Sequence, residues 1–201
     1  MSVEIVYETH SVTTDNEAGI AIGWLPGQLS EQGRRLAVGL GQRRRGDHLT
    51  AVLISDLTRA VETADLAFAG TGIPIRQDPR LRECDYGQLN GMPVARLQAE
   101  RLQHLDTPWP GGQSYRQVVD QTRDLLHELA ADWDGARLLL IAHSANRWAL
   151  DHLLLGRSLA DLIVAPFAWQ EGWHYTLPTG WTGDPPPLQT EGGIAVTPSD
   201  R

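Results

Sequence analysis

The sequence predicts an α/β protein with three layers, α/β/α, and a mostly parallel central sheet. Short segments that suit strands alternate with amphipathic segments that suit helices, as at residues 51–54 followed by 57–69. The connections are short, and this alternation is typical of a parallel sheet with helices on both faces. In such sheets ligands bind beyond the carboxyl ends of the strands, so residues just past each strand are candidates for a site.

Five segments are predicted to be strands because their length and composition suit this structure. They are residues 3–7 (VEIVY), 51–54 (AVLI), 74–77 (PIRQ), 137–142 (RLLLIA) and 173–177 (WHYTL). The segment at 137–142 has the strongest pattern of a buried strand, since almost all of its residues are apolar.

Four longer segments are predicted to be helices, at residues 30–45, 57–69, 114–133 and 145–155. Ser30 and Ser114 are good N-caps, since a serine hydroxyl can accept a hydrogen bond from a free N–H of the first turn. Gly70 and Gly156 can end the second and the fourth helix. Pro93 fits the first turn of a further short helix.

Chain length and composition predict one domain. Of the 201 residues, 41% are hydrophobic, which is enough for one sizeable core. We expect a single domain over residues 1–181, with a short lid around residues 92–113. Residues 182–201 contain three consecutive prolines, two adjacent glycines and almost no large apolar residue, so we expect a flexible tail there.

The charge and the cysteine count exclude several classes of protein. The formal net charge of -8 argues against a nucleic-acid partner and against an acidic membrane surface. Two basic clusters, residues 34–35 and 43–45, are interpreted as solvated helix faces. The single cysteine, Cys84, excludes an internal disulfide and a cysteine-based zinc site. The N-terminus lacks a signal-peptide pattern and no apolar run is long enough for a bilayer, so we expect a cytoplasmic protein with no membrane partner.

Two histidines follow two of the predicted strands. His10 comes after residues 3–7, and His143 comes directly after residues 137–142. Most histidines are structural or lie on the surface, but the carboxyl ends of parallel strands meet at one edge of a sheet. We therefore expect these two imidazoles to face each other across a cleft.

Five sequence blocks then occur in an order that is typical of one family. They are Asn16 and Gly23 followed by Trp24 and LSEQGRRLA (29–37), SDLTRAVETA (55–64), LRECDYGQLNG (81–91), PGGQS (110–114) and LLLIAHS (138–144). Over these blocks, from about residue 3 to about residue 156, the chain resembles the histidine phosphatase superfamily, the phosphoglycerate-mutase-like proteins. The resemblance implies a phosphoglycerate-mutase-like fold and hydrolysis of a small phosphomonoester through a phosphohistidine, without a metal or other cofactor.

The resemblance also implies a role for each site residue. His10 matches the nucleophilic histidine, Glu83 the acid/base carboxylate and His143 the second histidine. The expected substrate-binding residues are Arg59, Asn16, Thr9, Ser11, Gly23 and Ser144. No residue is expected to bind a metal. The expected partner is a small-molecule phosphate ester, and an oligomer is possible.

The chemistry of phosphoryl transfer agrees with these roles. It needs a nucleophile aimed at phosphorus, positive charge or N–H donors around the phosphoryl oxygens, and an acid for the leaving oxygen. The imidazole of His10 must be neutral and held in one tautomer, for which we expect a backbone carbonyl after the first strand. Arg59 offers a planar fork that fits two phosphate oxygens. Structural alternatives remain open: Arg59 could pair with Glu62, Glu83 could be a surface carboxylate, and Asn16 could be a turn residue.

The first motif departs from the family. Thr9, His10 and Ser11 stand where the family has Arg-His-Gly, so one direct phosphate contact is missing. Losing such a contact costs about 2–4 kcal/mol of transition-state stabilisation, by analogy with the loss of one oxyanion donor. Glu8 lies two residues before His10, and we expect its carboxylate to repel phosphate. Residues 144–146 also differ from the helix start that is common in the family.

Three explanations of this departure remain open. In the first, Arg82 or Arg147 replaces the missing arginine and the protein is a phosphatase. In the second, the histidines and carboxylates perform acid-base chemistry on a substrate that has no phosphate. In the third, catalysis is lost and the domain is a binding module.

The expected lid bears on the type of reaction. A mutase-type isomerase is a further alternative, but the lid holds only Arg96 and Arg101 as cations, which favours a phosphatase. The lid is short and ends near a tryptophan, which suggests a small or partly apolar substrate. Several tryptophans are candidates for lining such a pocket or for core packing. They are Trp24, Trp109, Trp169, Trp173 and Trp181.

Overall fold

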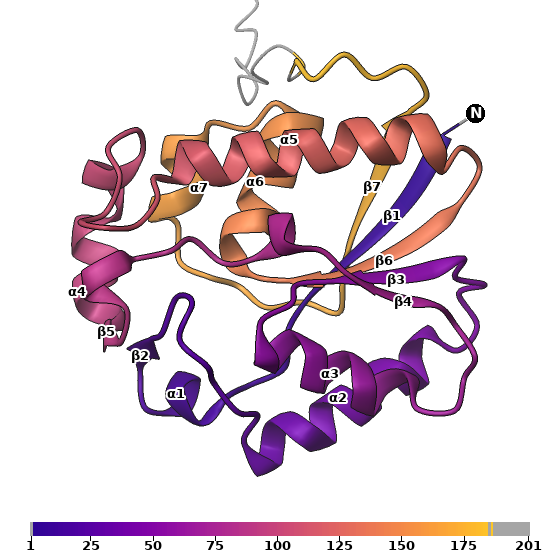
Figure 1. Cartoon of the computed structure of the whole chain (residues 1–201), viewed down its shortest axis with the longest axis horizontal. Coiled ribbons are helices and arrows are strands. Elements are labelled where there is room, and N and C mark those ends of the chain that lie inside the picture. Colours follow the sequence, from indigo (N-terminus) through magenta and orange to yellow (C-terminus); the bar gives the residue numbers. More distant parts are fainter. Residues whose placement is uncertain (1, 185, 187–201) are drawn as a thin grey trace, which may run out of the picture.

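A computed structural model of the chain describes residues 2–184 and 186, and a five-stranded sheet lies at its centre (Figure 1). The strands follow the order β4-β3-β6-β1-β7. Strands β1, β3, β4 and β6 run parallel to one another, and β7 pairs with β1 in the antiparallel sense. Their bounds are β1 Ser2–Thr9, β3 Ala51–Ile54, β4 Ile75–Gln77, β6 Arg137–Ala142 and β7 Trp173–Pro178. The predicted mostly parallel sheet and its five strands are confirmed.

Helices cover both faces of this sheet. Figure 1 shows α2 (Glu31–Arg44) and α3 (Thr58–Phe68) on one side, and α5 (Tyr115–Asp132) and α6 (Ser144–Leu155) on the other. Successive side chains of a strand point to opposite faces, and the two cores divide accordingly. Val6 packs in the smaller core with residues of α2 and α3, whereas Tyr7 packs in the larger one with residues of α5 and α6. The predicted α/β/α architecture is confirmed.

The four predicted helices are confirmed, and none of their ends shifts by more than one residue. Ser30 Oγ accepts a hydrogen bond from Gly33 N at 3.0 Å, and Ser114 Oγ accepts one from Gln117 N at 3.2 Å, as expected of N-caps. Gly156 ends α6 in the left-handed conformation, with φ at 66°.

The smaller elements lie mostly at one end of the molecule, to the left in Figure 1. Pro93 was expected inside the first turn of a helix, but it lies in a strand and immediately precedes the helix. Periodicity cannot detect a strand of two residues, which explains why β2 and β5 were not predicted. The elements are α1 Thr14–Glu17, β2 Ile20–Ala21, η1 Pro79–Leu81, η2 Gly87–Leu89, β5 Met92–Pro93, α4 Val94–Glu100, η3 Arg101–His104 and α7 Leu159–Val164.

Two sequence predictions concern membranes and the tail. Among the described residues, no helix is both long and apolar enough to cross a membrane. Of the expected tail at 182–201, residues 185 and 187–201 lie outside the described part of the chain.

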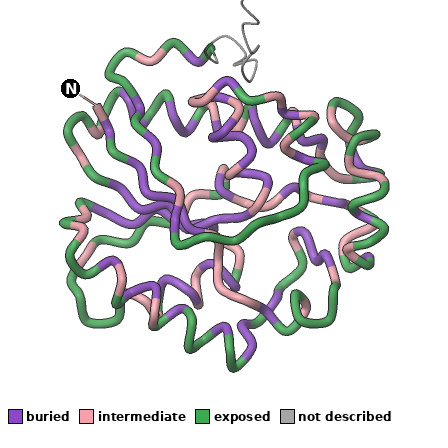
Figure 2. Tube along the Cα trace, turned by 180° about the vertical axis from the view of Figure 1, so that it is seen from behind, coloured by how far each residue is buried: buried purple, intermediate pink, exposed green. Residues whose placement is uncertain are grey.

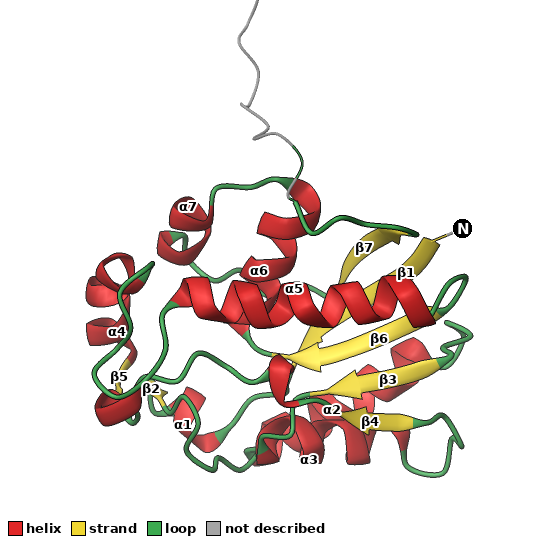
Figure 3. Cartoon of the chain, turned by 45° about the horizontal axis from the view of Figure 1, so that its top comes forward, coloured by secondary structure: helices red, strands yellow, loops and turns green. Residues whose placement is uncertain are grey.

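The register of β1 and β6 positions the two histidines. Thr9 pairs with Ala142, and His10 N donates a hydrogen bond to Ala142 O at 2.9 Å. His10 and His143 therefore leave the sheet from adjacent strands at the same level. Figure 3 shows that β3, β4 and β6 also point toward this edge, where the loops of the small elements gather.

Candidate active site

Four residues that are far apart in the sequence meet at this edge, with Arg59 at their centre. Arg59, in the first turn of α3, donates from Nε to His10 Nε2 at 3.2 Å and contacts His143 Nδ1 with Nη2 at 3.3 Å. The centroids of the two imidazole rings are 5.0 Å apart. Glu83 comes from the loop after η1 and lines the same cavity as His10 and Arg59. The two imidazoles come together as expected, but they do not face each other across a cleft, because His143 is not among the residues that line the cavity.

Backbone carbonyls hold Arg59 in this position. Its Nη2 donates to Gly23 O at 2.8 Å and its Nη1 to Leu25 O at 3.4 Å, and the side chain is buried. Gly23 has φ at 52°, and a Cβ there would lie 1.9 Å from Asn90 Oδ1, so only glycine fits. Gly23 lines the cavity as predicted, and its carbonyl also fixes the arginine.

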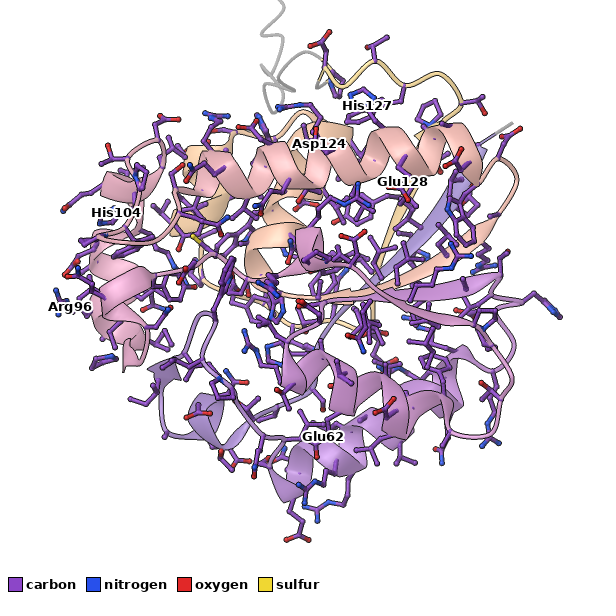
Figure 4. All side chains as sticks on the ribbon, in the orientation of Figure 1. Glu62, Arg96, His104, Asp124, His127 and Glu128 are labelled. Atoms are coloured by element: carbon purple, nitrogen blue, oxygen red, sulfur yellow. The ribbon has the colours of Figure 1, made fainter. Side chains whose placement is uncertain are left out.

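Arg59 does not pair with Glu62, which was the structural alternative. Glu62 lies where α3 faces α2 (Figure 4) and accepts from Arg34 Nε at 2.8 Å and from Leu29 N at 2.9 Å. The guanidinium of Arg59 instead forms hydrogen bonds with the two histidines and the two carbonyls.

The donors and acceptors define the tautomers of both histidines. A guanidinium only donates hydrogen bonds, so His10 Nε2 and His143 Nδ1 both act as acceptors. The proton of His10 then sits on Nδ1 and is donated to Ser11 O at 2.7 Å. The carbonyl expected after the first strand is that of Ser11. The proton of His143 sits on Nε2, a buried atom without a hydrogen-bond partner among the described residues.

Burial keeps both imidazoles neutral. Desolvation, reinforced by the positive charge of Arg59, lowers the pKa of His10 from 6.5 to about 3. The same two causes, with a smaller contribution from His10, lower the pKa of His143 well below its ordinary value. A neutral imidazole keeps the lone pair on His10 Nε2 that a nucleophile needs.

Glu83 is a carboxyl group with a raised pKa. Burial is the main cause, and it outweighs the hydrogen bond that Oε1 accepts from Cys84 N at 2.8 Å and the positive charge of Arg59. The neighbouring arginines do not bind it: Arg82 Nε donates to Asp56 at 2.7 Å, and Arg80 binds Asp78 and Glu128. Glu83 is therefore not the surface carboxylate of the structural alternative, and its raised pKa suits a proton donor.

The remaining predicted residues line the cavity, whose volume is about 420 Å³. They are Thr9, Ser11, Asn16 and Ser144. Ser11 already donates from Oγ to Gly33 O at 2.6 Å, and Asn16 Oδ1 accepts from Thr13 N at 3.0 Å in a capping box. Asn16 is thus a turn residue as well as a cavity residue. His143 lies behind Arg59 and is not among the lining residues.

The expected repulsion between Glu8 and phosphate is wrong because the charge of Glu8 is balanced. Its carboxylate is 1% exposed and accepts from Arg44 at 2.6 and 3.1 Å and from Arg43 at 3.3 Å. Arg44, expected on a solvated face, is buried for the same reason. The strand pleat turns Glu8 toward α2, 36 residues away in sequence, and no local pattern indicates that contact.

The cavity contains two cations that the sequence analysis did not select as replacements for the missing arginine. Arg82 binds Asp56 and Arg147 binds Asp151, and neither lines the cavity. Arg43 of α2 and Arg101 of η3 line it instead. The composition of the expected lid pointed to Arg101, whereas nothing local pointed to Arg43.

Among residues 2–184 and 186, no group of three or more His, Cys, Asp or Glu side chains is arranged to hold a metal ion. The site of the described residues thus consists of two neutral imidazoles, a buried guanidinium, a carboxyl group with a raised pKa and further arginines. This set can bind an anion and transfer protons.

Comparisons with known proteins identify relatives of the chain. The family model for the histidine phosphatase superfamily (branch 1) matches residues 9–168. Glucosyl-3-phosphoglycerate phosphatase of Mycobacterium tuberculosis is 33% identical over 172 residues, which cover 78% of this chain and 77% of that protein. Probable phosphoglycerate mutase GpmB of Cronobacter sakazakii is 30% identical, over 77% of this chain and 75% of that protein.

A solved structure has the same fold. The native structure of the mycobacterial glucosyl-3-phosphoglycerate phosphatase superposes with a TM-score of 0.70 and 28% identity, and it covers 83% of this chain and 85% of that chain.

Proposed function

Because the chain belongs to the histidine phosphatase superfamily (branch 1), and is thereby an enzyme of the phosphoglycerate-mutase-like hydrolase type, we propose that it hydrolyses a small phosphomonoester through phospho-His10. The arrangement around Arg59 carries the proposal. One buried guanidinium donates hydrogen bonds to both imidazoles. The acceptor on His10 is therefore the lone pair of Nε2, and His10 lines the cavity.

In the first step, His10 Nε2 attacks phosphorus and the bond between phosphorus and the ester oxygen breaks. The leaving oxygen takes the proton of Glu83, and Ser11 O keeps the Nδ1 proton of His10 in place. In the second step, water attacks the phosphorus of phosphohistidine while the Glu83 carboxylate takes a proton from that water. The P–N bond breaks, inorganic phosphate leaves, and both residues return to their starting states.

Arg59 changes partners during this cycle. It donates to His10 Nε2, the atom that attacks, and the 3.2 Å distance makes this a long hydrogen bond. A phosphate dianion is a better acceptor for the guanidinium, so its arrival frees the lone pair of His10. The same negative charge favours protonation of His143, which then adds positive charge next to the transferring group.

Arg43 and Arg101 are the proposed replacements for the arginine that Thr9 displaces. Both line the cavity, and each has a buried Nε without a hydrogen-bond partner among the described residues. The balanced charge of Glu8 supports the same conclusion, since the carboxylate does not present a free negative charge to the substrate.

A phosphatase is favoured over a mutase because few cations stand over the site. Of the two arginines in the expected lid, Arg96 binds Glu100 at 2.8 Å and lies at the outer edge of the molecule (Figure 4), so only Arg101 lines the cavity. A mutase must also shield its phosphoenzyme from water, and this generally requires more positive charge over the site.

The test is turnover of p-nitrophenyl phosphate, 3-phosphoglycerate, glucosyl-3-phosphoglycerate and other small phosphomonoesters in EDTA. Wild type is compared with His10→Ala and with His174→Ala, a control on an exposed histidine of β7. We expect EDTA-resistant turnover in wild type and the control, a loss of at least about 10⁴-fold in His10→Ala, and an alkali-stable phosphohistidine in rapidly quenched wild type.

The alternatives predict other results. Turnover that survives in His10→Ala would remove the phosphohistidine mechanism. A folded wild type without activity on any ester would favour acid-base chemistry on another substrate, or a binding module. Transfer of phosphate within a phosphoglycerate, in place of its release, would indicate a mutase.

A further inference from the structure

The cavity of the active site has a second part whose lining is apolar. Besides His10 and Arg59, the cavity is lined by Leu36 and Leu40 of α2 and by Phe167 and Trp169 of the segment between α7 and β7. We call these four side chains the aromatic arm. The guanidinium carbon of Arg43 lies 5.9 Å from the ring centroid of Trp169, so α2 and this segment border each other.

The aromatic arm exposes large apolar side chains at the cavity. Leu36 is 43% exposed, Phe167 44% and Trp169 55%. Single exposed apolar residues are common on protein surfaces, but several that converge on one cavity next to catalytic groups mark a binding region. Figure 2 shows the segment between α7 and β7 as a continuous exposed stretch, and residues 164–171 are all exposed.

The polar groups beside the arm are balanced or cationic. Glu8 lines the cavity there, but Arg43 and Arg44 neutralise it. Arg43 has one hydrogen bond, to Glu8, and a buried Nε without a partner among the described residues. A flat ring can stack on Trp169 while Arg43 donates to an oxygen of the same ligand.

We propose that the aromatic arm binds the leaving-group end of the substrate, and that the substrate is a phosphomonoester of an alcohol that carries a planar aromatic ring. This inference rests on the proposed phosphatase function, because the arm and the nucleophile share one cavity. Because the cavity is shared, one molecule can place a ring in the aromatic arm and a phosphate beside Arg59 at the same time, and the substrate is such a molecule.

The test compares two esters with similar leaving groups, 2-(1-naphthyl)ethyl phosphate and ethyl phosphate. Both release a primary alkoxide, so their ratio of kcat/KM reports recognition of the ring and not the ease of P–O cleavage. We expect wild type to prefer the naphthyl ester by at least about 10-fold, since even one methylene in an apolar pocket changes kcat/KM by about 10-fold or more. In Trp169→Ala and Leu36→Ser this ratio falls at least fivefold.

Matched controls exist on the same helix and on the lid. Val38 of α2 is 44% exposed, almost the same fraction as Leu36, and Leu102 of η3 is 53% exposed, but neither lines the cavity. Val38→Ser and Leu102→Ser leave the ratio unchanged. A ratio near one in wild type, or an equal fall in the controls, overturns the proposal while the phosphatase function stands.

A binding measurement distinguishes an error in the role of the aromatic arm from an error in the proposed phosphatase function. Calorimetry measures the affinities of 2-(1-naphthyl)ethylphosphonate and ethylphosphonate, which cannot be hydrolysed, for wild type and Trp169→Ala. Tighter binding of the naphthyl compound that depends on Trp169, without turnover of any ester, refutes the phosphatase function and keeps the aromatic arm. A dimer in light scattering that Trp169→Ala dissociates, with no ring preference, means that a second copy covers the arm, and overturns the proposal.

Discussion

The two parts of the active-site cavity differ in how firmly their side chains are held. Around His10, each polar side chain is bound by the backbone: Ser11 O holds the imidazole, Gly23 O the guanidinium and Cys84 N the carboxyl. In the aromatic arm, Phe167 and Trp169 are exposed on a segment without regular structure. The difference agrees with the two proposed roles, since chemistry needs fixed donors and leaving-group recognition tolerates movement.

The largest expected effect sharpens this comparison by changing only proton transfer. Glu83→Gln removes the acid of the first step, so kcat/KM for ethyl phosphate, which reports formation of phospho-His10, falls by about 10²–10⁴-fold. With p-nitrophenyl phosphate the loss in kcat/KM is much smaller, because p-nitrophenolate leaves without a proton. The measurement is steady-state turnover of both esters. Glu128→Gln, on the exposed side of α5, is the control, and an equal loss of kcat/KM on the two esters would contradict the role of Glu83 as the acid.

The next effect concerns the buried ion pair between Glu8 and Arg44. Glu8→Ala leaves Arg44 buried without its main partner, which lowers the free energy of unfolding by about 3–5 kcal/mol. Urea unfolding measures the change. Glu31→Ala breaks the exposed pair with Arg35 and changes stability by less than about 1 kcal/mol.

A stability loss in Glu8→Ala as small as in the control would show that the pair is not buried in solution. The double variant Glu8→Met with Arg44→Met is expected to recover most of the stability, because neither charge then remains unpaired.

A smaller effect tests the fixed geometry around His10. Arg59→Lys keeps the charge but loses the planar fork that reaches both imidazoles and Gly23 O, so kcat/KM falls about 10²–10³-fold for aromatic and small esters alike. Arg116→Lys, in an exposed pair with Asp106, is the control. If the loss were confined to aromatic esters, Arg59 would belong to leaving-group recognition, and the division of roles between the two parts of the cavity would be wrong.

The smallest effect is on stability as the pH changes. The pKa of His10 is lowered to about 3 by burial and Arg59, so between pH 6.5 and 3 the unfolded chain binds a proton that the folded chain excludes. Stability is therefore full above pH 6.5 and falls as the pH decreases. At pH 5.5 the loss is up to about 1.4 kcal/mol for one such histidine.

Urea unfolding at pH 7.5 and 5.5, for wild type and His10→Asn, measures this term. The window lies above the pKa range of ordinary carboxyl groups. We expect a smaller pH dependence in the variant, and inorganic phosphate should reduce the dependence in wild type, since a bound anion favours the protonated imidazole. Equal slopes would mean that His10 is solvated in the folded state.

Much of the site could be predicted because it follows strand ends. His10 and His143 follow apolar strands whose parallel pairing was expected from the alternation of elements, and Arg59 lies just after another such strand, within the motif SDLTRAVETA (55–64). Glu83 was found by its motif alone, since the loop around it has no periodic pattern. Arg43 and the balanced charge of Glu8 were missed because their partners are distant in sequence.

The sequence by itself determined the layers, the order of the elements and the chemical groups of the candidate site. Hydrophobic period, caps and glycines act over a few residues and can be recognised in the printed chain. Only the tertiary structure decided which charges are neutralised, which nitrogen of each histidine carries the proton and which apolar side chains line the cavity. These properties depend on burial and on partners from other elements, and burial is a result of packing the whole chain.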